Sequence, residues 1–241
     1  MKKRYLFALL IVFNFYSSCS TSDNYDNTNE SSGSIGGNGS SEGEEGEGSS
    51  EGNDLPCSID LPDADYNVLF VGNSLTYVNF LPDLVKDKAA EIGITINTHM
   101  HARGNYALID HWEDGEVQDL INSCEFDFVV VQQGPSSQPY GFQLLMQSGA
   151  DFAAICNENG AELAFYMVWP SLTYFHTFDG VIANYTTAAS ANNAILCPVG
   201  TYWKAYIDET GDYSYYDFDG FHPTYLGSLV AAEVIVDSLF N

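Results

Sequence analysis

Basic residues are scarce in this chain of 241 residues. Seven Lys and Arg stand against 33 Asp and Glu, which gives a formal net charge of −26 at pH 7. A nucleic-acid-binding protein needs cations to displace counterions from phosphates, so this composition excludes that class of protein. It equally excludes attachment to an anionic membrane through a basic patch. Hydrophobic residues make up 45% of the chain, which is enough for one sizeable core and excludes wholesale disorder.

Metal-ligand patterns are also missing. No CxxC occurs, and no HExxH or comparable spacing accompanies His99, His101, His111 and His176, so we expect no metal site. The acidic stretch Asp208–Asp219 lacks the glycine position and the terminal Glu of a calcium-binding loop, and we interpret it as a solvated loop.

Long apolar runs are absent as well. The N-terminal run Tyr5–Phe13 is too short to span a bilayer comfortably, which takes ~20 apolar residues. It follows the cations Lys2–Arg4 and precedes the small residues Ser17 and Ser18, a pattern typical of a secretory signal. Because Cys19 comes directly after those serines, the segment resembles a bacterial lipoprotein signal.

This resemblance implies that residues 1–18 are a signal peptide and that Cys19 carries a lipid as the mature N-terminus. Membrane attachment would then depend on that lipid alone, at the outer membrane or the cell surface. An ordinary secretory signal is the alternative, and either interpretation takes the protein out of the cytoplasm.

Residues 19–56 are rich in Ser, Gly, Asn and Glu. They cannot bury enough surface to offset their ordering entropy, so we predict a disordered acidic tether; an acidic binding tail is the alternative. Residues 57–241 still hold 24 acids and four bases, a net charge of −20, so the folded part is acidic in its own right. We expect a single monomeric domain here, in which long-range repulsion disfavours polyanionic substrates.

Cysteines are few. Besides Cys19, the chain has Cys57, Cys124, Cys156 and Cys197, which allow three pairings that the sequence alone does not distinguish. Since an exported protein can oxidise its thiols, we expect one or two structural disulfides.

Short buried-strand patterns alternate with helical patterns in residues 57–241. The strand candidates are near-continuous apolar runs, as in parallel strands covered on both faces: Asn67–Val71, Ile94–His99, Phe126–Gln132, Leu163–Trp169 and Ala194–Val199. One predicted helix follows the first strand and places four apolar residues on one face: Leu81, Leu84, Val85 and Ile92. Three more predicted helices follow later in the chain: Gly141–Glu158, Gly180–Ala191 and Tyr225–Leu239. The alternation predicts an α/β fold, a three-layer α/β/α sandwich with a doubly wound, mainly parallel five-stranded sheet.

Ser74 is the first candidate for chemistry. It follows directly from the first predicted strand and precedes a helix, so its hydroxyl would stand at the carboxyl edge of the sheet, where such folds place their active sites. Gly72 allows a tight turn there, and free backbone N–H groups could receive a developing oxyanion. The alternative is a plain Ser/Thr helix-capping loop.

Asp219 and His222 are the second candidate, just ahead of the last predicted helix. A histidine can take a proton from a serine near neutral pH, and a carboxylate three residues away could orient its ring. The alternative is a loop histidine hydrogen-bonded to a nearby acid.

The order Ser74, Asp219, His222, with about 145 residues between the first two, resembles the SGNH (GDSL-like) hydrolases. That family has its nucleophile in a G-x-S block after the first strand and its acid and base in a late D-x-x-H block. The resemblance covers residues 66–241 and implies a flavodoxin-like sheet and a cofactor-free serine hydrolase. It also implies that the N–H groups of Ser74 and Gly104 face the oxyanion.

The third block of the family departs from its pattern in this chain. G-x-N-D is expected after the third strand, with the Asn side chain as a further oxyanion donor, but the chain reads QQGPSS. Gln133, Ser136 or neither takes that role. Alternatively, Gln132 and Gln133 only close the end of the strand with side-chain hydrogen bonds.

These residues predict an exported serine esterase, with Ser74 as nucleophile, His222 as base and Asp219 as the residue that orients the ring. O-acetylated glycans are one substrate class; a lipase or thioesterase is also compatible. Aromatic residues that could line a sugar cleft are Trp169, Tyr174, Phe175, Trp203, Tyr213, Tyr215 and Tyr216. The alternative, favoured by the broken third block, is a non-catalytic surface lipoprotein that binds a glycan in the same pocket.

Overall fold

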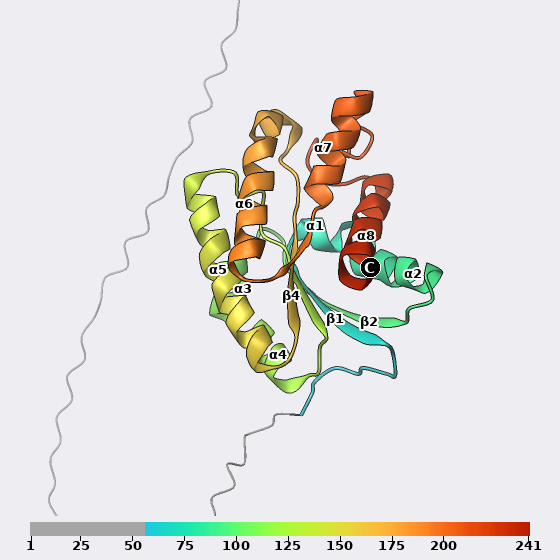
Figure 1. Cartoon of the computed structure of the whole chain (residues 1–241), viewed down its shortest axis with the longest axis vertical. Helices are drawn as coiled ribbons and strands as arrows, with labels where there is room; N and C mark the ends of the chain where they lie inside the picture. The colour runs from blue at the N-terminus through green and yellow to red at the C-terminus, as the bar shows by residue number, and fades with distance from the viewer. Residues whose placement is uncertain (1–55) are drawn as a thin grey trace, which may run out of the picture. The chain divides into compact units, whose positions relative to one another are not determined.

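The computed structural model describes residues 56–241 (Figure 1). The predicted signal peptide 1–18, the predicted lipidation site Cys19 and the predicted tether as far as residue 55 lie outside the described residues. Within the described part of the chain, no helix combines the length and the apolar character needed to cross a membrane.

A parallel sheet of five strands forms the centre of this domain, with the spatial order β2-β1-β3-β4-β5 and every neighbouring pair parallel. The strands are β1 Tyr66–Gly72, β2 Ile96–Ala102, β3 Phe128–Val131, β4 Glu162–Tyr166 and β5 Ile195–Cys197. The chain moves from β1 to the edge strand β2 and then returns across β1 to β3. This order confirms the predicted doubly wound α/β fold. The chain reverses direction across the sheet between β1 and β3, the position beyond whose carboxyl ends such folds bind their ligands.

Helices cover both faces of the sheet (Figure 1). On one face α2 and α8 pack against each other; on the other α5 packs against α3, α4 and α6. The α-helices are α1 Ser74–Tyr77, α2 Leu81–Glu91, α3 Leu108–Asp114, α4 Glu116–Ser123, α5 Pro139–Glu158, α6 Phe178–Ala191, α7 Val199–Thr210 and α8 Tyr225–Phe240. Two 3-10 helices complete the described elements: η1 Val78–Phe80 and η2 Leu172–Thr177.

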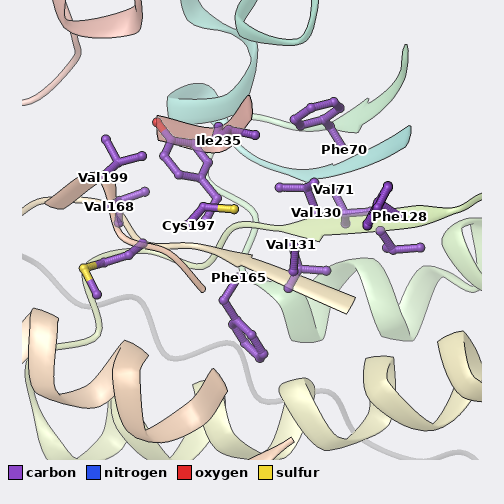
Figure 2. Packing of buried hydrophobic residues seen from close by; sticks show 14 of the residues in the cluster. Phe70, Val71, Phe128, Val130, Val131, Phe165, Val168, Cys197, Val199 and Ile235 are labelled. Carbon is purple, nitrogen blue, oxygen red and sulfur yellow. The ribbon is translucent and has the colours of Figure 1, made fainter. Parts of the chain in front are cut away.

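The core fills the space between these layers (Figure 2). The centre of β1, Val68–Val71, is completely buried, as expected for a strand covered on both faces. The Phe165 ring of β4 packs against α5 at Gly149, where any side chain would collide with the ring. Ile235 of α8 lies on the opposite side of the sheet.

Some predicted boundaries were wrong. The run Leu163–Trp169 was predicted as one strand because it is apolar, and it is buried throughout. The strand β4 nevertheless ends at Tyr166, which pairs with Cys197 at the end of β5, so the buried run is longer than the paired strand. Ile92, predicted to lie on the buried face of α2, is 50% exposed, since the helix ends at Glu91 and Gly93 turns the chain with φ of 84°. The helices α3, α4 and α7 were not predicted.

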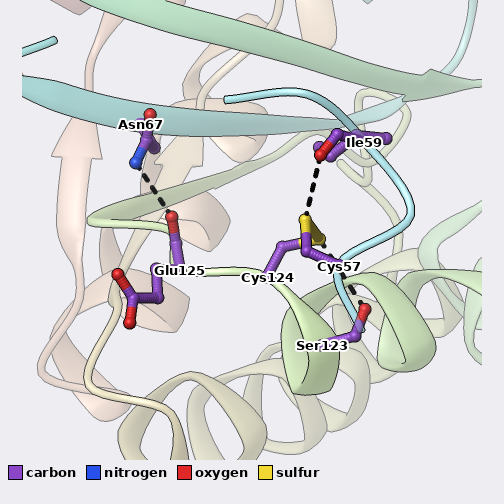
Figure 3. The surroundings of a disulfide bond; sticks show 6 residues. All are labelled: Cys57, Ile59, Asn67, Ser123, Cys124 and Glu125. Carbon is purple, nitrogen blue, oxygen red and sulfur yellow. Dashed lines mark hydrogen bonds between the residues drawn. A yellow bond between two sulfur atoms is a disulfide. The ribbon is translucent and has the colours of Figure 1, made fainter. Parts of the chain in front are cut away.

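One disulfide joins Cys57, ahead of β1, to Cys124 at the end of α4 (Figure 3). It closes a loop with a sequence separation of 67 residues, which removes much conformational freedom from the unfolded chain. Cys156 and Cys197 are free thiols in the core. Of the one or two disulfides expected, the described residues therefore contain one.

Burial raises the pKa of the Cys156 thiol and of the Cys197 thiol to about 12 each. The reactive thiolate is therefore scarce at pH 8, and the folded core also excludes the reagent. We expect neither cysteine to react with iodoacetamide in the native, non-reduced protein and both to react after unfolding in urea, as measured by mass spectrometry. Rapid alkylation of either cysteine in the folded protein would contradict this packing.

Candidate active site

Ser74 is the first residue of α1, immediately beyond the end of β1. The helix is capped by Asn73, whose Oδ1 accepts a hydrogen bond from the Leu75 N–H (3.1 Å). Because Asn73 is the capping residue, the Ser74 hydroxyl is not used for capping. The simple capping-loop alternative for Ser74 therefore does not hold.

Ser74, His222 and Asp219 form a continuous chain of hydrogen bonds. His222 Nε2 lies 2.9 Å from Ser74 Oγ, and His222 Nδ1 lies 2.5 Å from Asp219 Oδ2. The other carboxylate oxygen, Asp219 Oδ1, accepts the backbone N–H groups of Phe221 and His222, both at 2.9 Å. The structure thus brings together three residues that the sequence separates by up to 148 positions.

Asp219 is held as a carboxylate. The hydrogen bond from His222, followed by the two backbone N–H groups, lowers the pKa of the Asp219 carboxyl below its usual value. A charged carboxylate at Nδ1 keeps the proton on that ring nitrogen, so Nε2 is left as the acceptor that faces the Ser74 hydroxyl. The arrangement can deprotonate a serine.

Gly104 lies in the turn after β2, beside the Ser74 turn. The N–H of Arg103 donates to the carbonyl of Gly72 (3.0 Å), and the Asn73 side chain donates to the carbonyl of Tyr106 (3.0 Å). These bonds hold the turn from both sides. Among the described residues, the N–H groups of Gly104 and Ser74 have no hydrogen-bond acceptor.

Gln133 and Ser136 differ as donors. Gln133 is 5% exposed, and its Oε1 accepts the N–H of Leu108 (2.7 Å), which fixes the side-chain amide. Its Nε2 donates to no residue of the described chain. Ser136 Oγ instead donates to the carbonyl of Gly134 (3.0 Å), within its own loop. Gln133 therefore has an uncommitted donor, whereas the Ser136 hydroxyl is already used.

Comparisons with known proteins concern the fold of this chain. No protein-family model matches the sequence, and no curated protein matches it. A solved structure assigned to the SGNH hydrolases, from Slackia heliotrinireducens, is 24% identical, with a TM-score of 0.64 over 72% of this chain and 98% of that one. This chain has the SGNH hydrolase fold.

Two further solved structures share the SGNH fold. A lipase/acylhydrolase from Enterococcus faecalis is 15% identical, with a TM-score of 0.58 over 71% of this chain and 94% of that one. A variant of an acetyl-xylooligosaccharide esterase from a Geobacillus species is 14% identical, with a TM-score of 0.55 over 74% of this chain and 95% of that one. At these identities, the likeness concerns the fold.

Gln132 connects the parts of this candidate site. It is 1% exposed, and its Oε1 accepts two hydrogen bonds at 2.9 Å each, from the Asn73 N–H and from the Thr76 hydroxyl. Its Nε2 donates to the carbonyl of Gln133 (2.7 Å). A Cβ at Gly72 would lie 2.6 Å from Gln132 Oε1, so only glycine allows this approach. Gln132 closes the strand end as one alternative predicted, and it also fixes both flanks of the Ser74 turn.

Two other residues that contact the site were not recognised from the sequence. His111 is fully buried, and its Nε2 donates to the carbonyl of Gly72 (2.8 Å). Asn79 Nδ2 donates to the carbonyl of Pro223 (3.0 Å), the residue after His222, and to Ser228 Oγ (2.9 Å). Neither belongs to a recognisable motif, because both act through contacts between segments that are distant in the sequence.

Most of the aromatic residues predicted to line a sugar cleft do not do so. Trp169 and Trp203 are 0% exposed and stack on each other with their ring centroids 3.5 Å apart. Tyr215 and Tyr216 are buried beside them. These four rings belong to the core, and the prediction was wrong for them; Tyr174, at 61% exposed, remains available.

Replacing Gln132 by Met keeps most of its volume but removes its hydrogen bonds. The Asn73 N–H and the Thr76 hydroxyl would lose their buried acceptor, at a cost of about 1–3 kcal/mol for each unsatisfied group. We expect kcat for ester hydrolysis to fall roughly 10- to 100-fold while KM stays within about threefold, because the turn loses its geometry rather than its substrate contacts. Steady-state kinetics would measure both.

The matched control is Gln147→Met, at an exposed position on α5. It should leave kcat unchanged. A folded Gln132→Met protein with the wild-type kcat would show that Gln132 does not position the site.

Proposed function

We propose that this protein is a serine hydrolase that cleaves carboxylic esters. The observation that carries the proposal is the hydrogen-bonded chain from Asp219 through His222 to Ser74 at the carboxyl edge of the sheet. The SGNH fold shared with a lipase/acylhydrolase and an acetyl-xylooligosaccharide esterase supports it.

In the first half of the reaction, Ser74 Oγ attacks the ester carbonyl while its proton passes to His222 Nε2. The carbonyl oxygen becomes an oxyanion. When the tetrahedral intermediate collapses, the bond between the carbonyl carbon and the alkoxy oxygen breaks, and His222 gives its proton to that oxygen. The alcohol leaves and an acyl group remains on Ser74.

In the second half, water gives a proton to His222 and attacks the acyl carbonyl. Collapse of this intermediate returns the proton to Ser74 Oγ and releases the carboxylic acid. Asp219 stabilises the imidazolium in both halves. No cofactor takes part in these steps.

The oxyanion would be bound by the N–H groups of Ser74 and Gly104 and by Gln133 Nε2. All three donors are uncommitted in the described chain, which favours Gln133 over Ser136 as the replacement for the Asn of the family pattern. One such donor contributes about 3–4 kcal/mol to the stability of the transition state in a comparable site. The intact donor set also argues against the non-catalytic binding protein.

For the substrate, we propose neutral esters such as O-acetylated glycans. The net charge of −20 over residues 57–241 disfavours polyanions by long-range repulsion, while it leaves neutral substrates unaffected. One solved structure with the same fold is an acetyl-xylooligosaccharide esterase, which supports this substrate class by analogy.

We further propose that the enzyme acts outside the cytoplasm, as a monomer attached through a lipid on Cys19 to the outer membrane or the cell surface. The signal-like pattern of residues 1–18 supports export. The Cys57–Cys124 disulfide supports it independently, because such bonds persist mainly in oxidising compartments.

Replacing Ser74 by Ala should abolish hydrolysis of p-nitrophenyl acetate. Loss of the nucleophile lowers kcat by roughly 10³-fold or more in serine hydrolases. Because the Ser74 side chain does not cap α1, thermal unfolding of the variant should match that of the wild type. Ser190→Ala, at an exposed position of α6, is the control and should keep full activity. Retained hydrolysis in Ser74→Ala would exclude this mechanism.

A further inference from the structure

A cavity of about 690 Å³ lies beyond the carboxyl ends of β3 and β4, beside the proposed catalytic histidine. Its walls come from the segments after these strands, at Pro135 and Pro170, from η2 at Tyr174, and from Phe221. The Phe221 ring lies next to the His222 ring, with centroids 5.2 Å apart. The volume falls within the roughly 300–1,000 Å³ that small-ligand sites occupy.

The position of the cavity decides which half of the ester it receives. In the mechanism above, His222 Nε2 hands its proton to the alkoxy oxygen, so the departing alcohol lies on the histidine side of the scissile bond. The oxyanion-donor candidates Ser74, Gly104 and Gln133 do not line the cavity, whereas Phe221, whose ring lies beside that of His222, does. The cavity is therefore placed for the alcohol half.

Four polar side chains in the cavity wall have no hydrogen-bond partner in the described chain: Ser137, Gln138, Ser171 and His176. Together they offer two hydroxyls, an amide and an imidazole. A fatty acyl chain would shield these groups from water without satisfying them, which costs free energy. An apolar chain is thus a poor occupant.

The same wall contains no Asp, Glu, Lys or Arg, so it offers no permanently charged partner for a charged ligand. It does offer apolar surface at two prolines and two aromatic rings, including the 61%-exposed ring of Tyr174. A neutral ligand with hydroxyls along its edge and an apolar face matches both features. A sugar ring has this character, since its C–H face stacks on aromatic rings and its hydroxyls need hydrogen-bond partners.

We propose that this cavity binds the alcohol half of the ester as a neutral saccharide and that Tyr174 determines this specificity by stacking on the sugar ring. The proposal rests on the ester hydrolysis proposed above. It adds that selectivity lies in the alcohol half of the substrate and not in the acyl chain.

The test compares the wild type with Tyr174→Ala and with the control Tyr202→Ala. Tyr202, on α7, is 55% exposed and does not line the cavity. The substrates are mono-O-acetylated methyl pyranosides of xylose, glucose and N-acetylglucosamine, with ethyl acetate as the ester without a sugar. Acetate release is measured in each case.

We expect the wild type to prefer at least one sugar acetate over ethyl acetate. Tyr174→Ala should raise KM for that sugar acetate about fivefold to tenfold, the loss expected for one aromatic stacking contact, and should leave kcat/KM for ethyl acetate within about twofold. Tyr202→Ala should change neither value.

Binding without turnover gives a second readout. Saturation-transfer NMR on Ser74→Ala should detect the non-acetylated methyl pyranoside of the preferred sugar, and adding Tyr174→Ala should remove that signal. If the wild type hydrolyses no ester, no preferred sugar is known, and the NMR experiment then uses all three methyl pyranosides. Binding to the cavity is thus tested even when the proposed function fails.

Three outcomes would overturn the proposal. The wild type could show no preference for any sugar acetate, or Tyr174→Ala could impair ethyl acetate as much as the sugar ester. A shift in acyl-chain preference between p-nitrophenyl acetate and p-nitrophenyl octanoate in Tyr174→Ala would assign the cavity to the acyl half. If Ser74→Ala kept its hydrolytic activity, the proposed function would fail, whatever the binding result.

Discussion

The buried amide of Gln132 is the interaction on which the site depends. Its oxygen receives the backbone N–H that precedes Ser74 and the Thr76 hydroxyl that follows it, and its nitrogen holds the carbonyl of Gln133. One side chain thus sets the Ser74 turn after β1 relative to Gln133, the donor candidate after β3. Such a network rigidifies a site when every member is satisfied, and leaves costly unpaired groups when one is removed.

The sheet order makes this network possible. Because β1 lies between β2 and β3, the turns after all three strands meet at one edge, and each contributes one oxyanion-donor candidate: Gly104, Ser74 and Gln133. The last helix, α8, begins just after His222, and Asn79 ties that segment back to the region after α1. The segment that carries Asp219 and His222 is therefore tied to a distant part of the chain by a few polar contacts.

The sequence predicted the five strands, the doubly wound α/β fold and the serine, aspartate and histidine of the hydrogen-bonded chain, because each rests on local pattern or spacing. It did not predict the role of Gln132, since that depends on the pairing of β3 beside β1 and on the missing side chain at Gly72. The sugar-cleft prediction failed for Trp169 and Trp203 for a related reason. Composition shows that aromatic rings are present, whereas only packing shows which of them face solvent.

In the proposed mechanism, the geometry around Ser74 activates it as a nucleophile. The most direct measurement is reaction of the full-length protein with a fluorophosphonate probe, followed by mass spectrometry of the labelled peptides. An activated serine attacks the phosphorus and keeps the probe, whereas an ordinary serine does not react. We predict one phosphonyl group, on Ser74, and its loss in His222→Ala. An unlabelled Ser74 in the folded protein would contradict it.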